Sequence, residues 1–105
     1  MMSLDESANG QQVALTMGAQ MVVDLAENPT AGYRWQVESS GAPALSIDGD
    51  RYEAPAPGRA GAPGRHSWSF RAIAPGHGTI RLAYRRSFGG AASTFSVQVE
   101  VAPPG

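Results

Sequence analysis

Strict alternation of apolar and polar side chains is the feature that most constrains the fold of this chain. The clearest example runs from Phe95 to Val101, where apolar residues alternate with Ser, Gln and Glu. Successive side chains of a β-strand point to opposite faces, so this pattern predicts a strand with one buried face. Similar alternation occurs over residues 13–17, 21–25, 33–37, 66–72 and 80–84, and more weakly over 45–52. No segment has a convincing helical period.

Short strands separated by turn-forming residues predict an all-β domain. The architecture that best fits this spacing of strands and turns is an immunoglobulin-like antiparallel β-sandwich of about seven to eight strands. A chain of 105 residues is long enough for one domain with a single core. We expect residues 1–10 to be a flexible N-terminal segment and residues 11–102 to form that single domain.

The connections between the expected strands fall into two groups. If successive strands run up and down, and residues 45–53 form one kinked strand, then connections 28–32, 54–64 and 87–92 share one end. The shorter turns near residues 18, 39–43 and 75–77 share the other end. A tight hairpin at residues 48–50 would break this arrangement. With one kinked strand, the loops richest in Pro and Gly form a single surface.

The segment "ENPTAGYRW", residues 27–35, has an unusual turn chemistry. Pro29 fixes its own φ and holds Asn28 in the extended region, while Gly32 can adopt a positive φ. The two residues between them, Thr30 and Ala31, are small and uncharged. The pattern predicts a short, rigid and nearly neutral protrusion, for which an ordinary turn between two strands is the simpler interpretation.

The composition argues against several classes of function. The chain has no cysteine, which excludes disulfides, zinc–thiolate sites and a thiol nucleophile. A formal net charge of −1 gives no basic surface for nucleic acid. No apolar run approaches the roughly 20 residues that cross a bilayer. The first residues lack the features of a secretory signal. The localisation therefore stays open: we expect a periplasmic or secreted protein if a signal peptide was removed, and otherwise a cytoplasmic one.

Catalytic and metal-binding patterns are absent as well. His66 and His77 do not have metal-ligand spacing. Asp48-Gly49-Asp50 lacks the further ligands of a calcium loop and favours turn chemistry. Ser87 is not part of a G-x-S-x-G elbow. We therefore expect no enzyme, no metal and no cofactor, and we look for a binding function in the loops.

Three motifs in the loops carry a resemblance to a known family. The sequence N-P-T-A-G-Y-R-W at residues 28–35 resembles the N-P-T-T-G-Y-x-W signature of the chagasin family, protein inhibitors of papain-like cysteine peptidases. G-A-P-G at residues 61–64, followed by F-R-A at residues 70–72, resembles the G-x-x-G loop and the F-x-A strand of that family. R-S-F at residues 86–88 stands where the family has Arg-Pro-Trp. The motifs occur in the family's order.

The resemblance implies a reversible, non-covalent inhibitor, acting as a monomer, whose three loops wedge into the active-site cleft of a papain-like cysteine peptidase. The middle loop, residues 28–33, would approach the catalytic cysteine, and Tyr33 and Trp35 would support its base. The implied peptidase-binding residues are Asn28, Pro29, Thr30, Ala31, Gly32, Tyr33, Gly61, Ala62, Pro63, Gly64, Arg86, Ser87 and Phe88.

The chain departs from the family pattern at four positions. Ala31 replaces the second Thr and Pro63 replaces a Gly, while Ser87 and Phe88 replace Pro and Trp. Phe88 offers a smaller contact than Trp and no indole N–H. The alternative function is an immunoglobulin-like interaction module that keeps the loop scaffold and binds a protein other than a peptidase.

Overall fold

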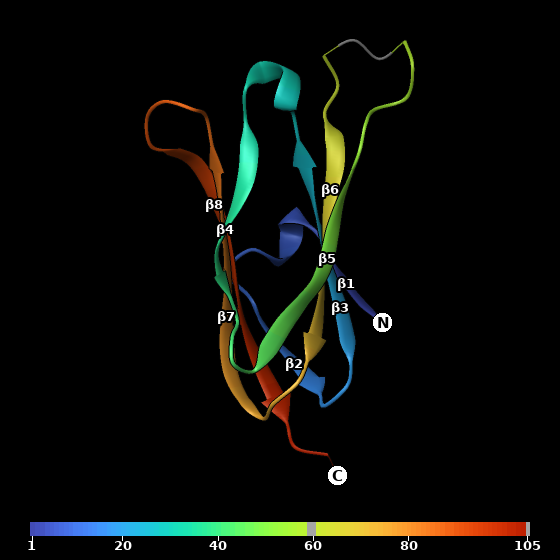
Figure 1. The fold of residues 1–105 in the computed structure, drawn as a ribbon, viewed down its shortest axis with the longest axis vertical. Coiled ribbons are helices and arrows are strands. Elements are labelled where there is room, and N and C mark those ends of the chain that lie inside the picture. The colour runs from blue at the N-terminus through green and yellow to red at the C-terminus, as the bar shows by residue number, and fades with distance from the viewer. Residues whose placement is uncertain (59–60, 105) are drawn as a thin grey trace.

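A computed structural model, which describes residues 1–58 and 61–104, shows two four-stranded β-sheets packed face to face (Figure 1). The first sheet has the strand order β1-β3-β6-β5 and the second has the order β2-β8-β7-β4. The predicted sandwich is therefore confirmed. No helix among the described residues is long and apolar enough to cross a membrane. The strands are β1 Met2–Leu4, β2 Gln12–Thr16, β3 Gln20–Glu27, β4 Arg34–Ser40, β5 Leu45–Glu53, β6 Gly64–Ala72, β7 Gly76–Arg85 and β8 Ala91–Ala102.

The core lies between the two sheets and follows from the alternation of the sequence. In β3, every second side chain from Met21 onward is buried, and β6 and β8 repeat this pattern. The buried side chains form one cluster, in which each fully buried large apolar residue contributes about 1.5–3 kcal/mol. The largest apolar members of that cluster with almost no exposure are Phe70, Phe95, Met21, Leu25, Leu45, Ile80 and Leu82.

The expected grouping of the loops is also confirmed. β5 is one continuous strand from Leu45 to Glu53, with a register shift between Ile47 and Gly49 in place of a hairpin. The connections that follow β3, β5 and β7 consequently emerge at the same end, at the top of Figure 1. We call residues 28–33, 54–63 and 86–90 the first, second and third loops. Residues 59–60 of the second loop lie outside the described residues.

The N-terminal residues differ from the flexible segment expected over residues 1–10. β1, Met2–Leu4, pairs in parallel with β3, and a single 3₁₀ turn, η1 Glu6–Ala8, buries Ala8 in the core. β2 also pairs in parallel with β8, so both sheets are mixed rather than wholly antiparallel. A strand as short as β1 is below the length at which alternation is recognisable.

Candidate functional site

The first loop is a single turn of 3₁₀ helix with its own hydrogen bonds. This turn, η2 Pro29–Ala31, ends at Gly32, whose φ of 87° confirms the expected positive φ. The Asn28 carbonyl accepts from the Ala31 N–H at 3.1 Å, and the Pro29 carbonyl accepts from the Gly32 N–H at 2.9 Å. A Cβ at Gly32 would meet nothing within 4 Å, so only the backbone conformation requires glycine here.

The base of the first loop is fixed by hydrogen bonds between the two sheets, because β3 and β4 belong to different sheets. The Trp35 indole Nε1–H donates to the Ala26 carbonyl at 2.8 Å, and the Trp35 backbone N–H donates to Glu27 Oε2 at 2.8 Å. The Asn28 backbone N–H donates to the Tyr84 hydroxyl at 2.8 Å. Trp35 packs against the core, which confirms its expected supporting role.

Stacked aromatic rings connect the first loop to the third. Tyr33 stacks on Tyr84 with 5.1 Å between ring centroids, and Tyr84 in turn lies 4.7 Å from Trp35. The Arg86 guanidinium lies 4.8 Å above the Tyr33 ring, a distance suited to a cation–π contact. Tyr33 is half-buried in this stack, so it supports the loop from below rather than forming part of its tip.

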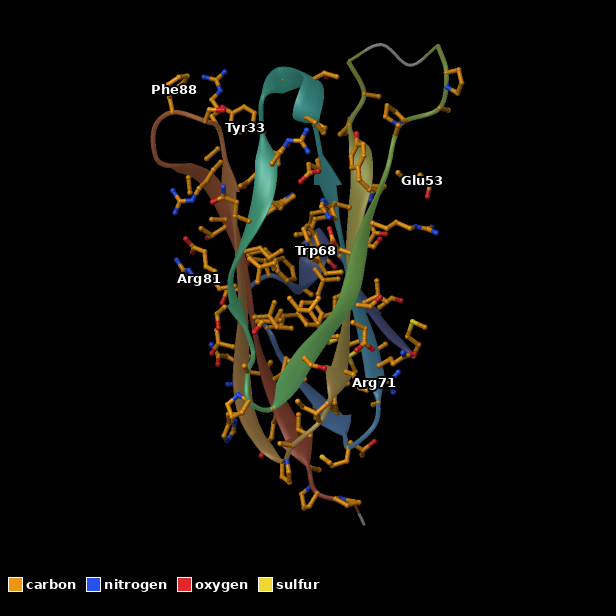
Figure 2. The ribbon with its side chains drawn as sticks, in the orientation of Figure 1. Tyr33, Glu53, Trp68, Arg71, Arg81 and Phe88 are labelled. Carbon is orange, nitrogen blue, oxygen red and sulfur yellow. The ribbon has the colours of Figure 1, made fainter. Side chains whose placement is uncertain are left out.

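The third loop carries the most exposed large apolar side chain among the described residues. β7 ends at Arg85, and Gly89 turns the chain back with a φ of 88°. Phe88 is 88% exposed, and Figure 2 shows it on the outer part of this loop. The strand has left the sandwich by Arg86, as expected from the sequence. A groove between the first and third loops is lined by Ala31, Gly32, Arg86, Ser87 and Phe88.

The second loop combines exposed and buried motif residues. Gly61, with a φ of 81°, and Pro63 are exposed, and Ala62 is half-buried. Gly64 is buried, and a Cβ there would overlap the Tyr52 ring and the Glu53 carbonyl. Glycine is therefore needed at position 64 for the packing of β5 against β6. The need for glycine at this position thus comes from packing within the domain and not from the close approach of a binding partner.

The sequence analysis did not identify a buried carboxylate beneath the loops. Glu27 is 1% exposed, and its Oε1 lies 3.0 Å from His66 Nδ1. The other ring nitrogen of His66, Nε2, lies 2.6 Å from Asp50 Oδ2. The alternation of β3 did contain the signal, because Glu27 continues the inward series of Met21, Val23 and Leu25.

A second polar cluster joins the N-terminal residues to the base of the second loop. Arg65, next to Gly64, forms ion pairs with Glu6 at 3.1 Å and with Asp24 at 2.6 Å. Partial burial raises the pKa of the Glu6 carboxyl. The hydrogen bond from the Ala26 N–H and the nearby Arg65 guanidinium together lower this pKa by more than burial raises it. The pKa of Glu6 therefore lies below its ordinary value of 4.5.

Comparison with known proteins agrees with this arrangement. The family model described as "Chagasin family peptidase inhibitor I42" matches residues 14–101. The chain is 32% identical to Amoebiasin-1 of Entamoeba histolytica over 104 residues, which cover 95% of this chain and 99% of that relative. The family match also agrees with the expectation that the chain is not an enzyme.

Solved structures share the same fold. The crystal structure of the cysteine protease inhibitor EhICP2 from Entamoeba histolytica superposes with a TM-score of 0.85 at 23% identity, covering 96% of this chain and 95% of that one. The solution structure of amebosin gives a TM-score of 0.76 at 35% identity, covering 96% and 97%. The family model covers most of the chain, and the three loop motifs lie at one end of the sandwich. The chain therefore belongs to the chagasin family of peptidase inhibitors.

Proposed function

We propose that this chain is a reversible, non-covalent inhibitor of papain-like cysteine peptidases, and that its three loops enter the active-site cleft together. The observation that carries the proposal is the shared position of the three motif-bearing loops at one end of the sandwich (Figure 1). One copy of the chain carries all three loops, so a monomer is sufficient for binding.

The first loop is suited to the deepest part of such a cleft. Its turn is closed by internal hydrogen bonds, and its base is tied to both sheets, so little conformational entropy is lost on binding. Thr30 and Ala31 are exposed, small and uncharged, which allows close approach to a narrow slot without burying a charge. Blocking the slot in this way needs no nucleophile on the inhibitor.

The other two loops would contact the walls of the cleft. Phe88 offers a large apolar side chain, and such anchors carry much of the energy of many interfaces. Gly61, Ala62 and Pro63 would contact the opposite wall, while the buried Gly64 and the half-buried Tyr33 would hold their loops in place. The remaining proposed contacts are those of Asn28, Pro29, Thr30, Ala31, Gly32, Arg86 and Ser87.

Titration of papain with the purified protein tests this function. We expect stoichiometric loss of peptidase activity, recovery of activity on dilution, and an inhibitor of unchanged mass after incubation. Trypsin is the control, because its cleft has a different shape and its activity should remain. Full activity of both papain and a cathepsin L-like peptidase at high inhibitor concentration would contradict the proposal and favour an interaction module with another protein partner.

A further inference from the structure

A buried carboxylate lies at the point where the first loop leaves its sheet. Glu27 is the last residue of β3, and each of its oxygens has a partner. Oε2 accepts the Trp35 backbone N–H at 2.8 Å, and Oε1 lies 3.0 Å from His66 Nδ1. A buried carboxylate is costly to desolvate, so these partners are needed for it to remain in the fold.

His66 lies between this carboxylate and a second one. Its side chain is 14% exposed, its ring stacks on Trp68 at 4.0 Å, and its Nε2 lies 2.6 Å from Asp50 Oδ2. The imidazole therefore contacts one carboxyl group through each of its two nitrogens. These two contacts join β3 to β5 across β6.

Asp50 reaches His66 because of a β-bulge. Ile47 pairs with the buried Phe70, and after the register shift Asp50 pairs with Trp68, which is also buried. The extra residue reverses the facing of the chain, a common use of bulges. Asp48, two positions earlier, instead pairs with Arg71 at 3.3 Å. The bulge within Asp48-Gly49-Asp50 therefore places the Asp50 carboxyl group next to His66, while the Asp50 side chain remains 55% exposed. Gly49 in this bulge has a φ of 156°.

The series Glu27–His66–Asp50 crosses three neighbouring strands of one sheet, β3, β6 and β5. β3 leads into the first loop, and β5 and β6 carry the second loop between them. We propose that this series, which we call the carboxylate–histidine relay, fixes the position of the second loop relative to the first. The inference rests on the proposed function in which both loops enter one cleft.

The edge strand β5 is the element that most needs such a contact. It has β6 as its paired neighbour in the sheet, and its residues from Ile47 to Glu53 are exposed. Two loops that enter the same cleft must keep their spacing, because a small displacement of one loop loses its contacts or those of the other. Asp50 is accordingly a positioning residue, and it acts on binding through the second loop.

The experiment compares two carboxylates of the same bulge. Asp50→Ala removes the relay's outer end, and Asp48→Ala is the matched control, because Asp48 is directed to Arg71 instead. We expect Asp50→Ala to raise the dissociation constant for papain about tenfold, and Asp48→Ala to leave it unchanged. Asp50→Asn keeps a side chain of the same size that can hydrogen-bond to His66 Nε2, and it should retain most of the affinity that Asp50→Ala loses.

Hydrogen exchange of the free inhibitor gives a second readout that does not depend on inhibition. In Asp50→Ala, the amides of Gly61, Ala62 and Gly64 should exchange faster than in the wild type, while those of Thr30 to Tyr33 should not change. In a Pro63→Gly background, which already loosens the second loop, the loss of affinity from Asp50→Ala should be smaller than in the wild type.

The outcomes separate the two proposals. If the wild type does not inhibit papain, the proposed function fails, and the exchange rates alone decide whether the relay holds the second loop. If the wild type inhibits papain and Asp50→Ala matches Asp48→Ala in affinity and exchange, the relay has no positioning role. A lower melting temperature in Asp50→Ala, with affinity and loop exchange unchanged, would likewise overturn the inference.

Discussion

The first and third loops stand side by side at the same end of the sandwich, yet they are built in opposite ways. The first loop is closed by its own turn hydrogen bonds and is tied to both sheets through Trp35 and Tyr84. The third loop has Phe88 at 88% exposure and turns at Gly89. The Arg86 guanidinium, which lies over the Tyr33 ring, links it to the first loop.

The difference predicts a division of roles within the proposed binding surface. A loop that is already ordered loses little entropy on binding, so it suits a narrow site with one acceptable shape. A loop with an exposed aromatic ring would supply apolar contact area at the proposed interface. Stability should therefore depend on the residues beneath the first loop, while affinity should depend on the exposed residues of both loops.

The largest effect is expected for Trp35→Ala. This change removes the ring that packs against Tyr84 and the core, together with the hydrogen bond to Ala26. We expect the free energy of unfolding to fall by about 4 kcal/mol, measured by chemical denaturation. Trp35→Phe, which keeps a ring, should lose much less. Weak inhibition with unchanged stability in Trp35→Ala would place the indole in the contact surface instead of beneath it.

Ala31→Asp should separate binding from stability in the first loop. Ala31 is exposed, so the variant should melt as the wild type does. In the complex the new carboxylate would be buried without a partner, and binding to papain should weaken by about 3 kcal/mol. Ala31→Ser, which is small and uncharged, is the control and should bind well. Unchanged affinity of Ala31→Asp would show that this loop is only a structural turn.

Phe88 offers the same test in the third loop. Phe88→Ala should weaken papain binding by about 2 kcal/mol, with the melting temperature nearly unchanged, because the ring makes few internal contacts. Phe88→Trp should retain or tighten binding, since it enlarges the contact. Fluorescence titration and thermal melts measure both quantities. A large fall in melting temperature for Phe88→Ala would mean that the ring packs internally and that the two loops do not differ as described.

Tyr84→Phe tests the connection at the base of the first loop. It removes the hydroxyl that accepts the Asn28 N–H and keeps the ring that stacks on Tyr33. We expect a loss of about 1 kcal/mol in the free energy of unfolding and faster exchange of the Asn28 amide. An unchanged Asn28 exchange rate would indicate that the aromatic stack alone holds the loop.

The sequence predicted the parts of the molecule that follow from local pattern. Alternation located β3, β6 and β8, and the positions of proline and glycine located the loops. The sequence did not predict the parallel pairing of β1 with β3 or of β2 with β8. The partner of an edge strand is set by contacts distant in sequence, which a local pattern does not reveal. The relay of Glu27, His66 and Asp50 was missed because ionisable residues are expected at the surface unless they are paired.

The parallel pairing of β2 with β8 has a consequence for how the chain reaches its fold. Gln12 lies opposite Gln98 and Thr16 lies opposite Ala102, so the second sheet joins residues 12–16 near the start of the sequence to residues 98–102 near its end. Pairing β2 with β8 closes a loop of most of the chain, and the chain loses conformational entropy before the stabilising contacts form. Topologies with such distant contacts fold slowly. During synthesis, β2 has no partner strand until β8 has been made. Until this last strand is added, the unpaired strand edges expose the nascent domain to aggregation.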